Sequence, residues 1–130
     1  MGKPHILVVD DEKEARSTII SFLESRFDCD FAEAEDGDKA IEHIRENPCD
    51  VMILDIKMPR KSGIIVIKEA REIKPDMDIL VVSAYASDDV AEQAMKLGAT
   101  DYAVKPLDLK AISLKFTNIL AKRGQNASKI

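Results

Sequence analysis

Short apolar runs and segments with helical periodicity alternate along the whole chain. An apolar run of about five residues between polar flanks is typical of a strand buried on both faces of a parallel sheet. Such runs predict strands at residues 5–9, 29–35, 51–55, 78–84 and 101–104. The pattern is weakest at 29–35, where polar and apolar residues alternate.

Between these runs, apolar residues recur every three or four positions, which places them on one face of a helix. The run 64–74 is ambiguous by composition, but its length and polar end favour a helix. Ser87 can cap the fourth helix and Gly98 can end it, and the last helix is expected to begin at about Leu107. The expected core positions outside 64–74 are Ala15, Thr18, Ile19, Phe22, Leu23, Ala40, Ile41, Ile44, Val90, Ala91, Ala94, Met95, Leu109, Ile112, Phe116, Ile119 and Leu120.

Five strands that alternate with five helices predict an α/β fold, in which a doubly wound parallel sheet is covered on both sides. A chain of 130 residues is large enough for one domain with a core of its own, which we expect to span residues 1–123. Residues 124–130 form a polar C-terminal tail that is expected to fray.

Composition excludes several classes of protein. The net charge of −5 argues against direct, non-specific binding to nucleic acid, and no apolar stretch approaches the length of a membrane span. With no signal-peptide pattern at the N-terminus, a cytoplasmic protein is expected. Cys29 and Cys49 lie in no CxxC or Cys/His cluster, so both are expected to be ordinary reduced thiols.

Polar residues follow four of the predicted strands at equivalent heights. They are Asp10 and Asp11 after the first strand, Asp55 at the end of the third, Ser83 in the fourth and Lys105 after the fifth. The carboxyl ends of parallel strands lie at one edge of the sheet, where sites form in this class of fold. We therefore expect these five residues to lie close together.

Each of the five residues also has an ordinary structural explanation. Asp11 followed by Glu14 resembles a helix N-cap with its capping-box acid, and Ser83 could be a buried hydroxyl bonded to the backbone. Lys105 could be a loop charge held extended by Pro106, and the other two aspartates suit turns. Taken singly, most of these explanations are the better ones. Taken together, these explanations do not account for the expected position of all five residues at one edge of the sheet.

Electrostatics indicates what such a cluster would hold. Three carboxylates within about 4 Å of one another repel by about 4 kcal/mol per pair at an effective dielectric constant near 20. Lys105 offsets part of this repulsion, and Mg²⁺, which prefers hard oxygen ligands, would offset the rest. The same charges and the hydroxyl of Ser83 could hold a phosphoryl group. Asp55 stands centrally among the strand ends and is the expected nucleophile, since the motif places no histidine beside Ser83.

Four motifs together resemble the receiver domain of two-component response regulators. They are "VVDDE", "LDIKMPRKSG", "VVSA" and "GATDYAVKP", and the resemblance covers residues 4–122. It implies a flavodoxin-like three-layer sandwich with strand order 2-1-3-4-5, in which residues 1–123 form the receiver domain. It also implies a signalling phosphoacceptor that catalyses only its own phosphorylation and dephosphorylation, rather than an enzyme acting on other substrates.

The resemblance assigns roles residue by residue. Asp10 and Asp11 match the acidic pair that holds Mg²⁺, and Asp55 matches the phosphorylated aspartate, which is also a metal ligand. The backbone carbonyl of Lys57 matches the remaining protein ligand. Lys57 and Tyr85 occupy positions that border the phosphoryl group, so we expect them to tune its lifetime.

A second group of matches concerns switching. Ser83 matches the hydroxyl residue that binds the phosphoryl group, and Lys105 matches the family's lysine. The bond before Pro106 is expected to be cis, and Tyr102 matches the aromatic switch residue that turns inward on activation. The implied partners are a sensor histidine kinase or a histidine phosphotransfer protein, and an unknown output partner. Exposed leucines on the last helix also leave room for a homodimer.

Three other functions are weighed against this one. A phosphatase of the haloacid dehalogenase class also uses an aspartate after an apolar strand, but it needs a second acid where this chain has Lys57. A receiver-like binding module that never accepts phosphate would not need the complete set of polar residues. A nucleotide-binding domain is disfavoured because neither GxGxxG nor GxxxxGK[ST] occurs.

Overall fold

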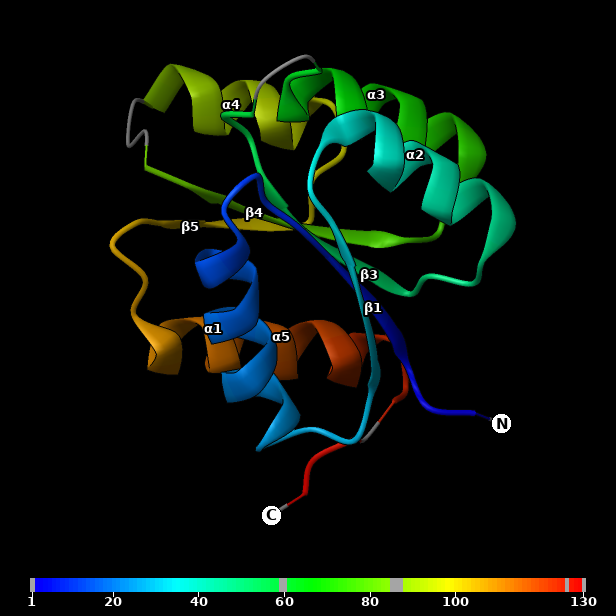
Figure 1. Cartoon of the computed structure of the whole chain (residues 1–130), viewed down its shortest axis with the longest axis vertical. Coiled ribbons are helices and arrows are strands. Elements are labelled where there is room, and N and C mark those ends of the chain that lie inside the picture. The colour runs from blue at the N-terminus through cyan, green and yellow to red at the C-terminus, as the bar shows by residue number, and fades with distance from the viewer. Residues whose placement is uncertain (1, 59–60, 85–87, 126, 130) are drawn as a thin grey trace.

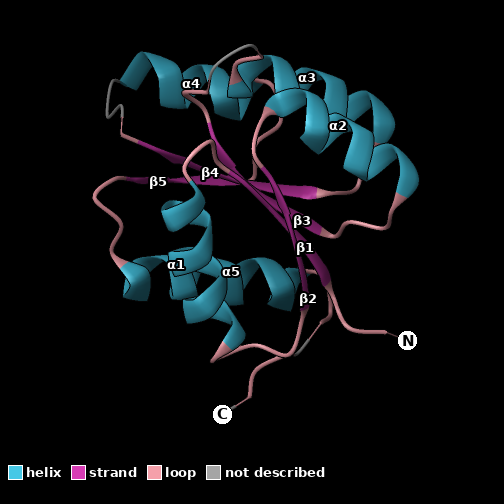
Figure 2. Ribbon diagram, viewed as in Figure 1, coloured by secondary structure: helices cyan, strands magenta, loops and turns pink. Residues whose placement is uncertain are grey.

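The computed structural model describes residues 2–58, 61–84, 88–125 and 127–129, without the side chain of Asp88. In this part of the chain, a parallel sheet lies between two layers of helices (Figures 1 and 2). The elements in chain order are β1 (His5–Val9), α1 (Lys13–Glu24), β2 (Asp30–Ala34), α2 (Gly37–Glu46), β3 (Val51–Asp55), α3 (Gly63–Ile73), β4 (Asp78–Ser83), α4 (Asp88–Lys96), β5 (Asp101–Val104) and α5 (Leu109–Lys122).

The strands lie in the order β2-β1-β3-β4-β5, and every neighbouring pair is parallel. Val9, the last residue of β1, is in register with Ala34 of β2 and with Leu54 of β3. The strands β1, β2 and β3 therefore end at nearly the same height. The predicted α/β sandwich and its strand order are confirmed, and the carboxyl ends of all five strands lie at one edge of the sheet.

The sheet separates two apolar cores. Helices α2, α3 and α4 cover one face, and α1 and α5 cover the other (Figure 2). In β3, Met52 and Leu54 face the first core, whereas Val51 and Ile53 face the second. Alternating side chains point to opposite faces of a strand, so a strand buried on both faces must be apolar throughout. This is why the apolar run at 51–54 is continuous.

Three elements have boundaries that differ from the sequence-based ones. β2 spans residues 30–34 instead of 29–35, and β4 ends at Ser83. α5 begins at Leu109 instead of Leu107, because the carboxylate of Asp108 accepts hydrogen bonds from the backbone N–H groups of the first turn. This acceptor makes Asp108 the N-cap and sets the helix start.

Two residues that were expected in the core are exposed. Thr18 lies on the solvent side of α1, and the side chain of Met95 on α4 is 43% exposed. Each residue is next to a buried position, Ile19 or Ala94, and a step of one residue rotates a side chain by about 100° around a helix. The expected cap Ser87 lies outside the described residues.

The two cysteines are free thiols, as expected. Burial raises the pKa of Cys29 and that of Cys49 to about 11. The thiolate is the reactive form of cysteine, so both groups are protonated and poorly reactive near neutral pH. This protonation state fits the absence of any metal or redox motif around them in the sequence.

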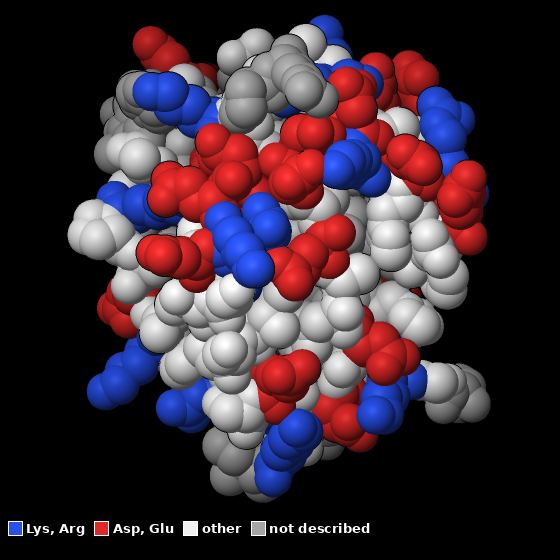
Figure 3. Space-filling view, in the orientation of Figure 1, with Lys and Arg blue, Asp and Glu red and all other residues white. Residues whose placement is uncertain are grey.

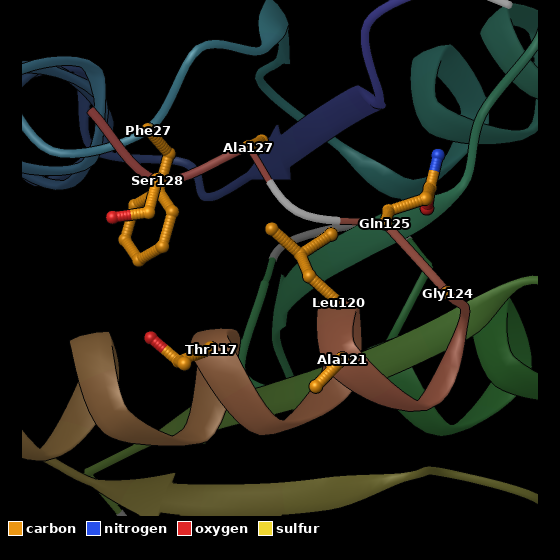
Figure 4. Close-up of a pocket in the computed structure, with 8 residues that line it drawn as sticks. All are labelled: Phe27, Thr117, Leu120, Ala121, Gly124, Gln125, Ala127 and Ser128. Atoms are coloured by element: carbon orange, nitrogen blue, oxygen red, sulfur yellow. The ribbon is translucent and has the colours of Figure 1, made fainter. Parts of the chain in front are cut away.

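Part of the predicted C-terminal tail, residues 127–129, packs against the end of α1. Ala127 is buried, its carbonyl accepts the N–H of Asp28, and Ser128 forms an antiparallel bridge with Phe27. A pocket of ≈ 310 Å³ separates this segment from the last turns of α5 (Figure 4).

None of the helices that the structure describes is long and apolar enough to cross a lipid bilayer.

Candidate functional site

Four of the predicted site residues meet at the carboxyl edge of the sheet. The ammonium of Lys105 lies 3.0 Å from a carboxylate oxygen of Asp10 and 3.2 Å from one of Asp55. Asp10, Asp11 and Asp55 each place a carboxylate oxygen within 4.8 Å of the others. Asp10 and Asp11 directly follow β1, Asp55 ends β3 and Lys105 directly follows β5, as the rule for parallel strand ends predicts.

The acidic pair consists of one buried and one exposed aspartate. Asp10 is buried, its N–H donates to the carbonyl of Ala34, and its carboxylate accepts the N–H of Glu12 at 2.9 Å. Asp11 is exposed. The capping-box interpretation of Asp11 is wrong, because Glu12 is the N-cap of α1 and no side chain caps this end. Asp11 is thus free of a capping role and lies at the mouth of the site.

Asp55 is the last residue of β3 and is almost fully buried. One carboxylate oxygen accepts the backbone N–H of Lys57 at 3.1 Å, and the other accepts from Lys105. Asp55 nevertheless lines an open pocket of ≈ 470 Å³, together with Asp11, Glu12, Lys57, Met58, Ala84 and Lys105. The carboxylate is therefore fixed by the protein and still reachable from solvent.

The remaining predicted residues lie around this centre. Ser83 is buried at the end of β4, and its carbonyl accepts the backbone N–H of Lys105 at 2.8 Å. Tyr102 is half-buried and packs against the core under α2, α3 and α4. The bond between Lys105 and Pro106 is cis, as the resemblance implies. Tyr85 lies outside the described residues.

The site carries more negative than positive charge. Figure 3 shows acidic side chains gathered over the loop that leads from β1 into α1, with basic side chains among them. Burial raises the pKa of Asp55; Asp10 adds to this effect and Lys105 opposes it. For Lys105, burial acts to lower the pKa, but the hydrogen bond and charge of Asp10 and those of Asp55 outweigh it and raise the pKa. Lys105 is therefore a stable cation.

The donor set fits a hard divalent cation. Mg²⁺ binds through one or two carboxylates and keeps several waters, so it needs clustered oxygens beside an open space. The carboxylates of Asp10, Asp11 and Asp55 provide the oxygens, and the adjoining pocket provides the space. This part of the structure could hold a metal ion.

Sequence reasoning missed two residues that shape the site. Arg16 donates to the backbone carbonyl of Asp10, and Gly63 donates its N–H to the carbonyl of Ile56, next to Asp55. The position of Arg16 early in the helix after the acidic pair was an available signal. For Gly63, the available signal was its place at the start of a helix, directly after the loop that follows the strand of Asp55.

Comparison with known proteins agrees with this geometry. The family model of the response regulator receiver domain matches residues 6–117. The transcriptional regulatory protein ZraR from Klebsiella oxytoca is 38% identical over 116 residues, which cover 89% of this chain and 26% of that protein. The chain thus spans about a quarter of the length of this curated relative.

Two solved structures are also similar. A CheY-like receiver domain protein from Methanospirillum hungatei JF-1 has a TM-score of 0.88 at 22% identity, with 95% of this chain and 98% of that chain covered, which shows the fold alone. A response regulator from Burkholderia pseudomallei, solved with a phosphorylated aspartic acid, a calcium ion and citrate, has a TM-score of 0.81 at 29% identity, with 93% and 71% covered.

The chain belongs to the response regulator receiver domain family. It is a receiver domain of the two-component type with a CheY-like, flavodoxin-like fold. Receiver domains are signalling domains that interact with histidine kinases and with output domains.

Proposed function

We propose that Asp55 accepts a phosphoryl group from a phosphohistidine of a sensor kinase or of a phosphotransfer protein. The observation that carries this proposal is the bridge of Lys105 between Asp10 and Asp55, beside a third carboxylate and an open pocket. A structural neighbour from Burkholderia pseudomallei was solved with a phosphorylated aspartic acid, which is consistent with the same chemistry here.

In the proposed step, a carboxylate oxygen of Asp55 attacks phosphorus while the bond from phosphorus to the histidine nitrogen breaks. The electron pair of that bond returns to the imidazole, which takes up a proton. Asp10, Asp11, Asp55 and the carbonyl of Lys57 would hold Mg²⁺, which neutralises charge on the transferred phosphoryl oxygens when it is bound. Lys105 supplies a fixed positive charge on the side of Asp10 and Asp55.

The switch follows from the added charge. The acyl phosphate carries about −1.5 to −2 in place of the single negative charge of a carboxylate. Lys105 and the hydroxyl of Ser83 are proposed to bind it, which lets Tyr102 turn inward and changes the surface of α4, β5 and α5. Val104 and Leu114 already expose apolar side chains there, so this surface can receive an output partner or a second copy.

Phosphorylation should add one phosphoryl group to the wild-type protein and none to Asp55→Asn. Asparagine keeps the size of the side chain but lacks the anionic oxygen that attacks phosphorus. The measurement is intact mass after incubation with Mg²⁺ and a small acyl-phosphate donor, with EDTA in a parallel sample. Lack of an adduct on the folded wild-type protein with every donor and metal would refute the proposal and favour a binding module.

The lifetime of the phosphoryl group should change in Lys57→Ala and in Tyr85→Ala. Lys57 is exposed at the rim of the pocket that contains Asp55, where its side chain can orient or hinder the attacking water. Removal of a hindering side chain shortens the lifetime, and loss of an orienting one lengthens it. Loss of radiolabelled phosphoryl from purified phosphoprotein measures the rate. Equal rates for the wild type and both variants would eliminate this role.

A further inference from the structure

The side chain of Arg16 connects three elements around the acidic pair. Arg16 lies in the first turns of α1, and its side chain is only 11% exposed. Its Nη1 donates to the backbone carbonyl of Asp10 at 2.7 Å, and its Nε donates to a carboxylate oxygen of Glu33 at 2.8 Å. Two different nitrogens of one planar guanidinium are thus engaged at once, and this fixes its orientation.

Glu33 anchors the arginine to the sheet. It lies on β2 in register with Val8 of β1, and Val8 faces the core under α1 and α5. Paired residues of neighbouring strands point to the same face of a sheet, so Glu33 is directed to the side on which α1 lies. The position of Arg16 is therefore set by a strand rather than by a loop.

The carbonyl that Arg16 holds belongs to the peptide bond between Asp10 and Asp11. Because a peptide unit is planar and stiff, a fixed carbonyl fixes the direction in which the chain continues into Asp11. Asp11 is exposed, so packing contributes little to its position. The carboxylate of Asp10 is held separately, by the N–H of Glu12 and by Lys105.

We propose that Arg16 is a positioning residue for the acidic pair: it ties the peptide between Asp10 and Asp11 to β2 and so preorganises both carboxylates for a divalent cation. This inference rests on the proposed function, in which that pair holds Mg²⁺. Groups behind the ligands of a metal ion commonly change its affinity by 10–100-fold when they are removed, because ordering of the ligands then has to be achieved on binding.

If Arg16 acted through its charge alone, its removal would change the Mg²⁺ affinity in the opposite direction. If the guanidinium acted only as a positive charge near the carboxylates, its removal would strengthen Mg²⁺ binding. A purely structural contact would lower the melting temperature and leave the Mg²⁺ affinity unchanged. Positioning predicts weaker binding even when the net charge is kept constant.

The test is calorimetric titration of the metal-free full chain with Mg²⁺. The double variant Arg16→Gln/Glu33→Gln removes both bonds and leaves the net charge unchanged, and it should bind Mg²⁺ about tenfold more weakly. The control Lys13→Gln/Glu14→Gln changes two exposed residues of the same helix at equal net charge and should stay within about twofold of wild type. Arg16→Lys keeps the charge but offers one donor nitrogen in place of two, so it should restore part of the loss.

The possible outcomes separate the positioning role of Arg16 from the proposed function. An affinity of the double variant within about twofold of wild type, or tighter, would overturn the positioning role. If that variant does not fold, Arg16→Lys is judged alone: weaker binding at a wild-type melting temperature supports the role, and unchanged binding overturns it. A wild-type protein that binds no Mg²⁺ would refute the proposed function, and this inference with it.

Discussion

Gly63→Ala should lower the free energy of unfolding by about 3 kcal/mol and the melting temperature by about 10 °C. A Cβ at this position would lie 2.5 Å from Cα of Ile56 and 2.9 Å from the carbonyl oxygen of Asp55. Both are backbone atoms, so no side-chain rotation can relieve the overlap. The backbone that carries Asp55 must therefore shift, or the start of α3 must move away from it.

Thermal and urea unfolding measure this effect, and two other glycines serve as controls. A Cβ on Gly2 would meet no atom within 4 Å, so Gly2→Ala should have no effect. Gly124 has equally open surroundings but a φ of +72°, so Gly124→Ala should cost only about 1 kcal/mol from backbone strain. A Gly63→Ala variant as stable as Gly124→Ala would contradict the close approach of α3 to β3.

Gly63→Ala should also slow the proposed phosphorylation of Asp55, even at temperatures at which the variant is folded. The clash displaces the carbonyl end of Asp55 and the following peptide, and thereby moves the carboxylate relative to Lys105. A displacement of about 1 Å in a reacting group can cost about 100-fold in rate. Rapid-quench experiments with an acyl-phosphate donor measure the phosphorylation rate, with Gly2→Ala as the matched control.

Lys105→Ala is expected to destabilise the metal-free protein by about 3 kcal/mol at neutral pH. Its ammonium contacts the carboxylates of Asp10 and Asp55, which are both almost fully buried. Without Lys105, two buried negative charges would face each other and Asp11 with no cation between them. Lys115→Ala is the control, because Lys115 pairs with Asp101 at a similar distance of 3.1 Å near the surface and should cost under about 1 kcal/mol.

The cost of Lys105→Ala should disappear in acid. The pKa of Asp55 is already raised by burial, and loss of Lys105 removes an effect that lowers it. A carboxyl whose pKa is higher in the folded state is penalised only when ionised, so the penalty is absent below the unfolded pKa of about 3.9 and grows as the pH rises through the folded pKa. Chemical unfolding in EDTA from about pH 4 to pH 7 measures this difference. A stability gap between variant and wild type that is constant with pH would show that the charge of the carboxylates is not the cause.

Mg²⁺ should compensate for the missing lysine. A divalent cation among the three carboxylates supplies positive charge where Lys105 did, so added Mg²⁺ should raise the melting temperature of Lys105→Ala more than that of the wild type. The same titration of Asp11→Asn should raise the melting temperature less than in the wild type, because this variant lacks one of the proposed metal ligands. Equal increases in the wild type and Lys105→Ala would mean that the lysine and the cation do not share a charge cluster.

Much of the fold could be predicted from local patterns. A buried parallel strand such as β3 needs apolar side chains on both faces, so its run is visible without any knowledge of its neighbours. The strand order follows from the family resemblance, and the common edge of the strand ends follows from the parallel sheet. The start of α5 at Leu109 was missed because the cap depends on one local hydrogen bond of Asp108, which apolar periodicity does not report.

Some residues of the candidate site could likewise be predicted from the sequence, and others were missed. The sequence predicted that Asp10, Asp55 and Lys105 lie close together, because each directly ends or follows a strand of one parallel sheet. Arg16 and Gly63 were missed. Their places in the sequence mark them as neighbours of the site, but their contacts with Glu33 and with the backbone of Ile56 depend on strand register and on the approach of a helix to a strand.

By itself, the sequence determined the alternation of strands and helices, the apolar faces that cover the sheet, and the residues that end its strands. Those features depend on side-chain type and spacing along the chain. Only the tertiary structure decided that Asp10 is buried and Asp11 exposed, that Arg16 ties their peptide to β2, and that residues 127–129 pack beside Phe27. These features depend on contacts between distant segments, and such contacts exist only when the packed core brings those segments together.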